Sequence, residues 1–167
     1  ESFFDSFRLL YGEFEEWFNK KADEWAYVSR SGGDIVAFMY LKVEDESEPY
    51  PDIVPAFTRK RRLKIGTLKV ALPGHKLGER LLKIAFDNAI RQRAQEIYVT
   101  VFPGDFEREQ LIDFLNGFGF INRGVKSTSN GDECVLVRDM AKTYDAGHPR
   151  KTYPFFPSRD RVLIVPI

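Results

Sequence analysis

The sequence predicts a mixed α/β fold with a mostly antiparallel sheet flanked by helices, and two observations support this prediction. Two hairpin patterns, at residues 24–43 and 124–140, each place two strand-forming runs around a short glycine-containing turn. Between them, residues 63–102 follow the order strand, loop, helix, strand, which packs a helix against a sheet. With further helical patterns at residues 3–18 and 106–114, the expected element order is ααβββαβαββ.

The first twenty residues predict two short amphipathic helices that are separated at Gly12. Apolar residues recur there at spacings of three and four, and we expect this stripe to be core rather than the wall of a binding site. The stripe consists of Phe3, Phe4, Phe7, Leu10, Phe14, Trp17 and Phe18. Residues 24–30 and 35–43 then predict a hairpin around the turn at 31–34. The acidic stretch 44–55 contains three prolines and predicts an exposed loop.

The second half of the pattern begins with a strand at residues 63–72. The glycine-rich run PGHKLG follows at 73–78, and a helix with one apolar stripe extends from there to about Ala94. A strand at 96–102 and a helix that ends near Gly117 and Gly119 come next. The last hairpin pairs 124–129 with 133–140, and its turn is Asn130-Gly131, a strong hairpin signal.

Length and composition restrict the kind of protein. The chain has 167 residues, and it contains no apolar run near the ~20 residues that span a bilayer. One cysteine, Cys134, cannot form an internal disulfide and is expected to be a small packed side chain; with only two histidines, His75 and His148, no zinc site is expected. The N-terminus lacks a signal-peptide pattern, so we expect a cytoplasmic protein without membrane contact.

The pattern also suggests a domain boundary. Residues 1–140 read as one domain, whereas 141–167 contain scattered prolines and are too few to form a core. We expect this C-terminal tail to pack on the domain or to lead to a further domain, and its run at 162–167 to form a strand at a sheet edge. Because no initiator methionine is present, we expect the chain to be part of a longer protein.

Charge is unevenly distributed although the net charge is zero. Residues 1–50 carry 12 acidic and 5 basic residues, whereas residues 51–100 carry 4 acidic and 11 basic residues. The basic middle either attracts phosphates or faces the acidic first third. Its densest cluster, Arg59 to Lys64, is interpreted as a solvated flank, with contact to a nucleic acid as the less favoured alternative.

The loop between the strand at 63–72 and the following helix is the most informative segment. A loop in this position directs backbone N–H groups at whatever lies over the helix N-terminus, which suits a pyrophosphate. Gly74 and Gly78 permit close backbone approach, and Lys76 and Arg80 add positive charge. The pattern alone is weak, because many strand-to-helix turns contain glycine for structural reasons.

Together with the element order, the runs PGHKLGERLL at 73–82 and LIDFLNGFGF at 111–120 resemble the GCN5-related N-acetyltransferase family. The likeness covers about residues 1–140 and includes the closing Gly119-Phe120. It implies a sheet splayed between the strands 63–72 and 96–102, a first strand that is missing here, and acetyl-CoA as co-substrate. By this resemblance the cofactor-binding candidates are Val70, Leu72, Gly74, His75, Lys76, Leu77, Gly78, Glu79 and Arg80.

The sequence departs from the family at several functional positions. Pro73 stands where the family usually has Gln or Arg, and Lys76 stands where it has the first glycine. Leu115 replaces the tyrosine that often protonates the leaving thiolate, and the strand at 63–72 contains no glutamate to act as a base. The catalytic residues are therefore unknown. Tyr98 and Thr100 are weak candidates, because alternate side chains of that strand point the same way.

Two hypotheses about function follow. The first is an N-acyltransferase that moves an acetyl group from acetyl-CoA to an unidentified amine. The alternative is a non-catalytic module of a multidomain protein, which keeps the acetyltransferase shape and binds a partner domain or a nucleic acid. The substituted phosphate loop and the missing tyrosine are the features that keep the alternative open.

Overall fold

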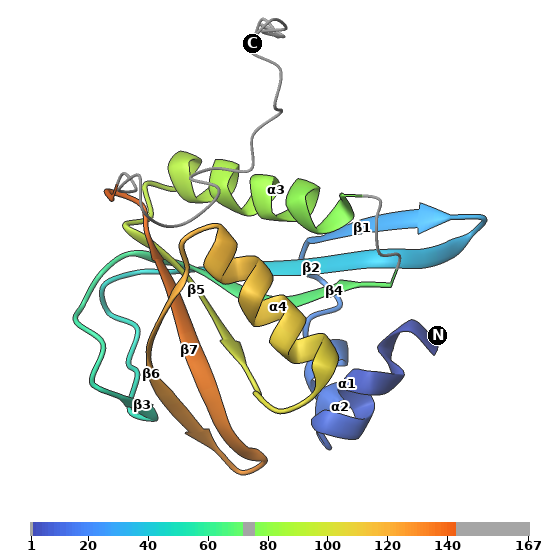
Figure 1. The fold of residues 1–167 in the computed structure, drawn as a ribbon, viewed down its shortest axis with the longest axis horizontal. Coiled ribbons are helices and arrows are strands. Elements are labelled where there is room, and N and C mark those ends of the chain that lie inside the picture. Colours follow the sequence, from blue (N-terminus) through green and yellow to red (C-terminus); the bar gives the residue numbers. More distant parts are fainter. Residues whose placement is uncertain (1, 72–75, 143–167) are drawn as a thin grey trace, which may run out of the picture.

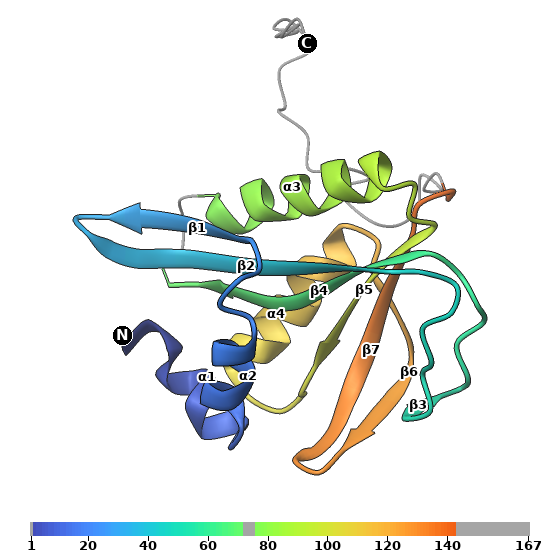
Figure 2. The same cartoon turned by 180° about the vertical axis from the view of Figure 1, so that it is seen from behind.

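The computed structural model describes residues 2–71 and 76–142, and Figures 1 and 2 show their arrangement. In chain order the elements are η1 (Ser2–Phe4), α1 (Asp5–Leu10), α2 (Phe14–Lys20), β1 (Ala26–Ser31), β2 (Asp34–Glu44), β3 (Ile53–Val54), β4 (Arg62–Val70), α3 (Leu77–Arg91), β5 (Glu96–Val101), α4 (Phe106–Gly117), β6 (Ile121–Thr128) and β7 (Gly131–Asp139). The predicted order ααβββαβαββ is confirmed, with one short strand added. No strand precedes α1 within the described part of the chain, whereas the resemblance implied one.

The described strands form one sheet in the order β1-β2-β4-β5-β7-β6-β3. All neighbours are antiparallel except β4 and β5, which are joined through α3 and run parallel. The added strand β3 corrects the expected exposed loop, because Ile53 and Val54 pair with Lys126 and Val125 of β6. Prolines on both sides keep this strand to two residues, since proline cannot donate to a ladder.

Both hairpins form where the pattern predicts them. The turn of the first hairpin places Gly32 at φ 58° and Gly33 at φ 95°, values that suit glycine because it has no Cβ. In the second hairpin Thr128 pairs with Gly131, so the turn residues are Ser129 and Asn130, one position earlier than expected. Helix α3 also ends at Arg91, three residues before the expected end, where Arg93 takes a left-handed conformation at φ 52°.

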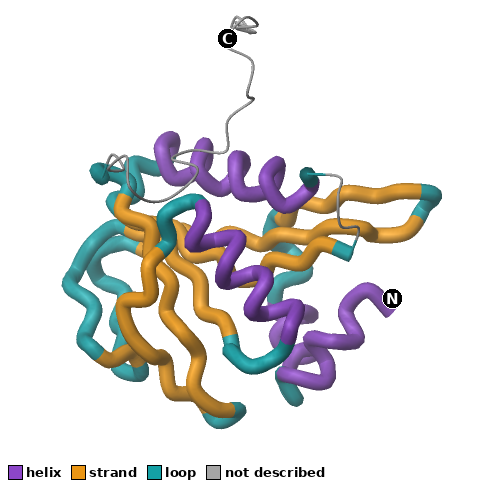
Figure 3. The backbone as a smooth tube through the Cα atoms, viewed as in Figure 1, coloured by secondary structure: helices purple, strands orange, loops and turns teal. Residues whose placement is uncertain are grey.

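Helices α3 and α4 cover one face of the sheet, as Figure 3 shows together with Figure 2. The main core lies between them and the inner residues of the central strands. Its most completely buried members include Ala37, Met39, Leu63, Ile65, Leu82, Phe86, Ile97, Leu115 and Phe118. Cys134 is half-buried and packs against this core, in agreement with its expected packing role.

The opposite face is covered by η1, α1 and α2. Phe4 and Phe14 are buried there against Phe38 and Tyr40 of β2, with the other aromatic residues of the N-terminal stripe around them. The rings of Phe4 and Phe38 meet edge to face with centroids 5.2 Å apart, which is a favourable aromatic geometry. The prediction that this stripe is core is therefore confirmed for its aromatic residues.

None of the described helices is long and apolar enough to cross a membrane. The expectations about His148, about the tail at 141–167 beyond residue 142 and about its strand at 162–167 fall outside the described residues. The division into a domain at 1–140 and a tail stays a prediction.

Candidate functional site

The two central strands diverge halfway along their length, and Figure 1 shows this fork between β4 and β5. Their pairing begins at Arg62 and Glu96 and ends at Ile65 and Val99, although β4 continues for five more residues. The expected splay of the sheet is therefore present. Beyond the last pair, the backbone edge of β4 that faces the fork has no partner from β5.

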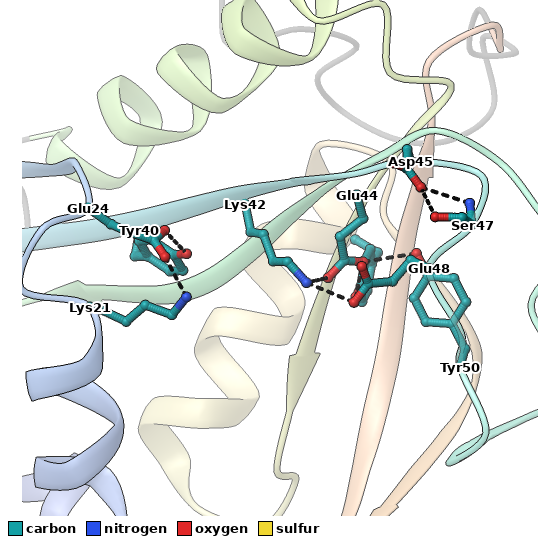
Figure 4. A network of polar contacts seen from close by, with 10 residues as sticks. Lys21, Glu24, Tyr40, Lys42, Glu44, Asp45, Ser47, Glu48 and Tyr50 are labelled. Atoms are coloured by element: carbon teal, nitrogen blue, oxygen red, sulfur yellow. Dashed lines mark hydrogen bonds and ion pairs between the residues drawn. The ribbon is translucent and has the colours of Figure 1, made fainter.

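A β-bulge lies at the point of divergence. The register between β2 and β4 shifts there, so that Tyr40 pairs with Thr67, Leu41 pairs with Ile65, and Gly66 is the extra residue. A Cβ on Gly66 would lie 2.7 Å from Cδ1 of Tyr40, so the Tyr40 ring uses the space that a side chain would need. The Tyr40 hydroxyl donates a hydrogen bond to Glu24, which holds the ring in this place (Figure 4).

Helix α3 begins beside the carboxyl end of β4. Lys76 precedes it in a left-handed conformation, φ 54°, and the Lys76 side chain makes no capping hydrogen bond to the first turn. The first N–H groups of any helix lack intrahelical acceptors, and here the exposed cations Lys76 and Arg80 lie beside them. Such a helix start favours an anion.

Six of the nine cofactor-binding candidates lie within the described residues. Leu72, Gly74 and His75 lie outside the described residues. The structure places Val70 at the end of β4, Lys76 before α3, and the other four in its first turn, namely Leu77, Gly78, Glu79 and Arg80. The role of these six residues stays a prediction.

Gly78 has a packing role that the sequence did not indicate. A Cβ at this position would lie 3.3 Å from Cζ of Phe114, so glycine allows the Phe114 ring of α4 to approach the first turn of α3. Leu115, the next residue of α4, is fully buried in the main core. It therefore supplies no proton donor at the position where the resemblance places a tyrosine.

A buried polar cluster lies on the face of the sheet opposite α3. The Glu44 carboxylate, only 2% exposed, accepts hydrogen bonds from the hydroxyls of Tyr98 at 2.7 Å and Tyr50 at 2.9 Å. Lys42 lies 3.2 Å from the other carboxylate oxygen and 2.7 Å from Glu48, as Figure 4 shows. Burial, followed by the bond to Glu44, raises the pKa of Tyr98 far above its ordinary value, so this hydroxyl keeps its proton.

Tyr98 and Thr100, the two candidates on β5, therefore differ. Tyr98 is committed to Glu44, which makes it a structural donor rather than an exchangeable acid. Thr100 is half-buried and lies one residue beyond the last β4–β5 pair, at the fork itself, where it pairs with Val135 of β7. Of the two, Thr100 lies nearer to where the strands separate.

The connection between α1 and α2 approaches the same face. Tyr11 donates a hydrogen bond to Glu133 of β7 at 2.9 Å, and its ring lies 5.4 Å from that of Phe102 after β5. Burial and the Glu133 charge raise the pKa of Tyr11, so it too stays protonated. No local pattern indicates the hydrogen bond between Tyr11 and Glu133, because these residues are 122 positions apart.

Three cations of the basic stretch at 59–64 have partners within the described structure. Arg62 is buried and its Nε lies 2.7 Å from Glu96, and Lys60 binds the other oxygen of the same carboxylate at 2.5 Å. Arg61 donates to the backbone oxygen of Gln92 at 2.7 Å. Glu96 and Gln92, which bind these side chains, lie in the middle third of the chain itself. The charge of Arg61 also acts on Asp45 of the acidic first third, so the two regions meet at this point.

Within the two described ranges, no group of three or more histidine, cysteine, aspartate or glutamate side chains could hold a metal ion.

Comparisons with known proteins address the fold. A scan against protein-family models and a search of curated proteins give no match. Among solved structures, Chaetomium thermophilum Naa20 in complex with a bisubstrate analogue gives a TM-score of 0.60 at 16% identity, over 75% of this chain and 72% of that chain. An aminoglycoside 6′-N-acetyltransferase complexed with coenzyme A gives 0.55 at 16% identity, over 86% and 91%.

A third solved structure supports the same fold. A GNAT family acetyltransferase from Elizabethkingia anophelis with acetyl-CoA bound gives a TM-score of 0.53 at 14% identity, over 75% of this chain and 83% of that chain. The identities are low, so these similarities establish the fold, and the fold class expected from the sequence is confirmed.

Proposed function

We propose that this chain, which has the fold of the GCN5-related N-acetyltransferases, is a divergent member of that family that transfers an acetyl group from acetyl-CoA to an amine. One observation carries the proposal: β4, which borders the fork with β5, leads to a helix start that carries Lys76 and Arg80. The fork offers unpaired backbone to an extended ligand, and the helix start offers N–H groups and cations to its phosphates.

The binding of acetyl-CoA follows from these residues. We expect its pyrophosphate to lie on the first turn of α3, held by the backbone of Leu77 to Glu79 and by the side chains of Lys76 and Arg80. We expect Val70 to contact the pantetheine arm at the end of β4, and the undescribed Leu72, Gly74 and His75 to complete the loop. Solved relatives of this fold bind coenzyme A, acetyl-CoA or a bisubstrate analogue, which supports this assignment.

The transfer itself needs little side-chain chemistry. A neutral amine attacks the thioester carbon, the carbon–sulfur bond breaks, and the amine proton leaves with the thiolate as CoA. Orientation of the two reactants supplies much of the rate enhancement, and a backbone N–H near the bulge at Gly66 would stabilise the developing oxyanion. The burial of Leu115 is compatible with this mechanism, because no dedicated acid is required.

Titration calorimetry of acetyl-CoA, with CoA and desulfo-CoA as comparisons, tests the binding. We expect micromolar affinity, and Lys76→Ala and Arg80→Ala should each raise Kd about tenfold, since one charge-assisted contact is worth about 1.5 kcal/mol. The matched control is Arg91→Ala, which removes the same charge from the far end of α3, about 16 Å beyond Arg80, and should leave Kd unchanged.

The alternative function is a non-catalytic module, and the fully buried Leu115 is the observation that favours it. A folded sample that binds none of the three coenzymes would support the module and refute the transferase. The nucleic-acid version of this alternative has less support, because Lys60, Arg61 and Arg62 have partners inside the protein. Affinity for nucleic acid that fell steeply with salt would restore it.

A further inference from the structure

Lys64 of β4 presents its amine on the face of the sheet opposite α3, next to the fork. It pairs with Tyr98 of β5, and the β4–β5 pairing ends one residue later. Its side chain is half-buried, with Nζ 5.6 Å from the centre of the Tyr98 ring. In residues 2–71 and 76–142, no hydrogen bond or ion pair holds this amine, whereas most cations of β2 and β4 have such a partner.

The charged groups around Lys64 come from the strands β2, β6 and β7. Glu44 and Lys42 belong to β2, Lys126 belongs to β6, and Glu133 belongs to β7. The two carboxylates serve other donors, because Glu44 accepts from Tyr98 and Tyr50, and Glu133 accepts from Tyr11. Burial first, and then the repulsion from Lys126 and Lys42, lower the pKa of Lys64, although the two carboxylates oppose this shift.

The position of Lys64 gives its amine access to an acyl group in the fork. Gly66, the bulge residue, follows two positions later, so the two Cα atoms are about 7 Å apart along the strand. The four-carbon stem of lysine is flexible and spans such a distance. The amine thus lies within reach of the fork in which the proposed function places the thioester, and within the described residues no ion pair must be broken before it reacts.

We propose that Lys64 is itself an acetyl acceptor, modified by the protein from acetyl-CoA at its own site. This inference rests on the proposed function. The lone pair of the neutral Nζ attacks the thioester carbon, a carbon–nitrogen bond forms and the carbon–sulfur bond breaks. The sulfur leaves with the bonding pair and receives the proton that the nitrogen loses, so the products are Nε-acetyl-lysine and CoA.

The test incubates the full chain with isotopically labelled acetyl-CoA and maps the label by peptide mass spectrometry. We expect labelling of Lys64 at a rate independent of protein concentration and at least tenfold faster than that of Lys69. Lys69 is the matched comparison, since it lies on the same strand and its pKa is also lowered by burial, but its Nζ donates to Ser6 at 2.5 Å. Lys64→Arg should abolish the fast labelling, and Lys69→Arg should preserve it.

Calorimetric titration of acetyl-CoA into the same samples separates this inference from the function on which it rests. If acetyl-CoA binds and Lys64 is labelled no faster than in urea-unfolded protein, self-acetylation is refuted and the transferase proposal stands. If acetyl-CoA does not bind, both are refuted. Because the labelling is mapped in the unmodified sequence, a folding defect in a variant cannot hide the result.

Discussion

Among the neutral polar groups around Glu44, we expect the Tyr98 hydroxyl to contribute most to the free energy of unfolding. Tyr98→Phe removes only this hydroxyl, which lies 2.7 Å from the Glu44 carboxylate, and keeps the edge-to-face contacts of the ring with Tyr50 and Phe57. Tyr98 is 2% exposed, so water cannot take the place of the lost donor. Tyr50→Phe is the matched comparison, because Tyr50 donates to the same oxygen but is half-exposed.

The magnitude follows from the kind of hydrogen bond that is lost. A bond to a charged acceptor contributes about 1.5–3 kcal/mol, and the buried Tyr98 belongs in the middle of that range. We therefore expect Tyr98→Phe to lower the free energy of unfolding by about 2 kcal/mol and Tyr50→Phe by about 1 kcal/mol. In urea, with a slope of about 2 kcal/mol per M, these losses shift the midpoint by about 1 M and 0.5 M.

We also expect the loss of stability in Tyr98→Phe to become smaller at alkaline pH. Because the pKa of Tyr98 is raised on folding, the folded state keeps a proton that the unfolded state loses above its ordinary pKa of about 10. This contribution is present below pH 10 and is lost at about 1.4 kcal/mol per pH unit above it. The gap between the two proteins should therefore narrow from about 2 kcal/mol at pH 8 to about 0.6 kcal/mol at pH 11.

Urea unfolding, followed by circular dichroism at pH 8 and pH 11, measures both effects. A Tyr98→Phe protein that is as stable as the parent at pH 8 would refute this prediction. A loss of stability no greater than that of Tyr50→Phe would also refute it, as would a stability difference between parent and Tyr98→Phe that does not narrow at pH 11.

Two further substitutions test the packing around the site. Gly124→Ala should lower the free energy of unfolding by about 2 kcal/mol, because the new Cβ would lie 2.4 Å from the backbone oxygen of Val54. The control Gly12→Ala should change this free energy little, because nothing lies within 4 Å of the new Cβ. Equal urea midpoints of the two variants would contradict the prediction. Arg62→Met should lower the free energy of unfolding by about 3 kcal/mol, because the substitution breaks the buried ion pair with Glu96. Lys60→Met should lower this free energy by less than about 1 kcal/mol, because Lys60 is partly exposed. Thermal unfolding of the two variants measures the difference, and a larger loss in Lys60→Met would contradict the prediction.

The hairpins were predictable because their signals are local. Gly32-Gly33 sets a turn between two strand patterns, and Asn130-Gly131 marks the second turn to within one residue. The short strand β3 was not predictable, since two residues between prolines carry no periodicity. It forms because β6 offers Val125 and Lys126 as partners, a choice that only the folded sheet makes.

The sequence predicted the helix start at Lys76 better than it predicted the polar cluster around Glu44. Lys76, Gly78 and Arg80 were predicted from the sequence as one group, because one strand, one loop and one helix bring them together. Glu44 was assigned to the start of an exposed acidic loop, yet it is 2% exposed. Residues 35–41 form a continuous apolar run without alternation, so the pattern does not indicate that Glu44 is buried, and its partners Tyr50 and Tyr98 could not have been named.

The sequence by itself determined the order of the longer elements and the turn positions to within one residue, and it predicted where phosphate-binding groups gather. These depend on spacing within about ten residues, and periodicity and glycine record such spacing directly. Tertiary structure decided which charges meet. Arg62 and Glu96 are 34 residues apart, and Glu44 and Tyr98 are 54 apart, so parallel and antiparallel strand pairing had to bring them together. Within residues 2–71 and 76–142, the amine of Lys64 has no hydrogen-bond or ion-pair partner, and the nearby carboxylates of Glu44 and Glu133 bind Tyr98 and Tyr11.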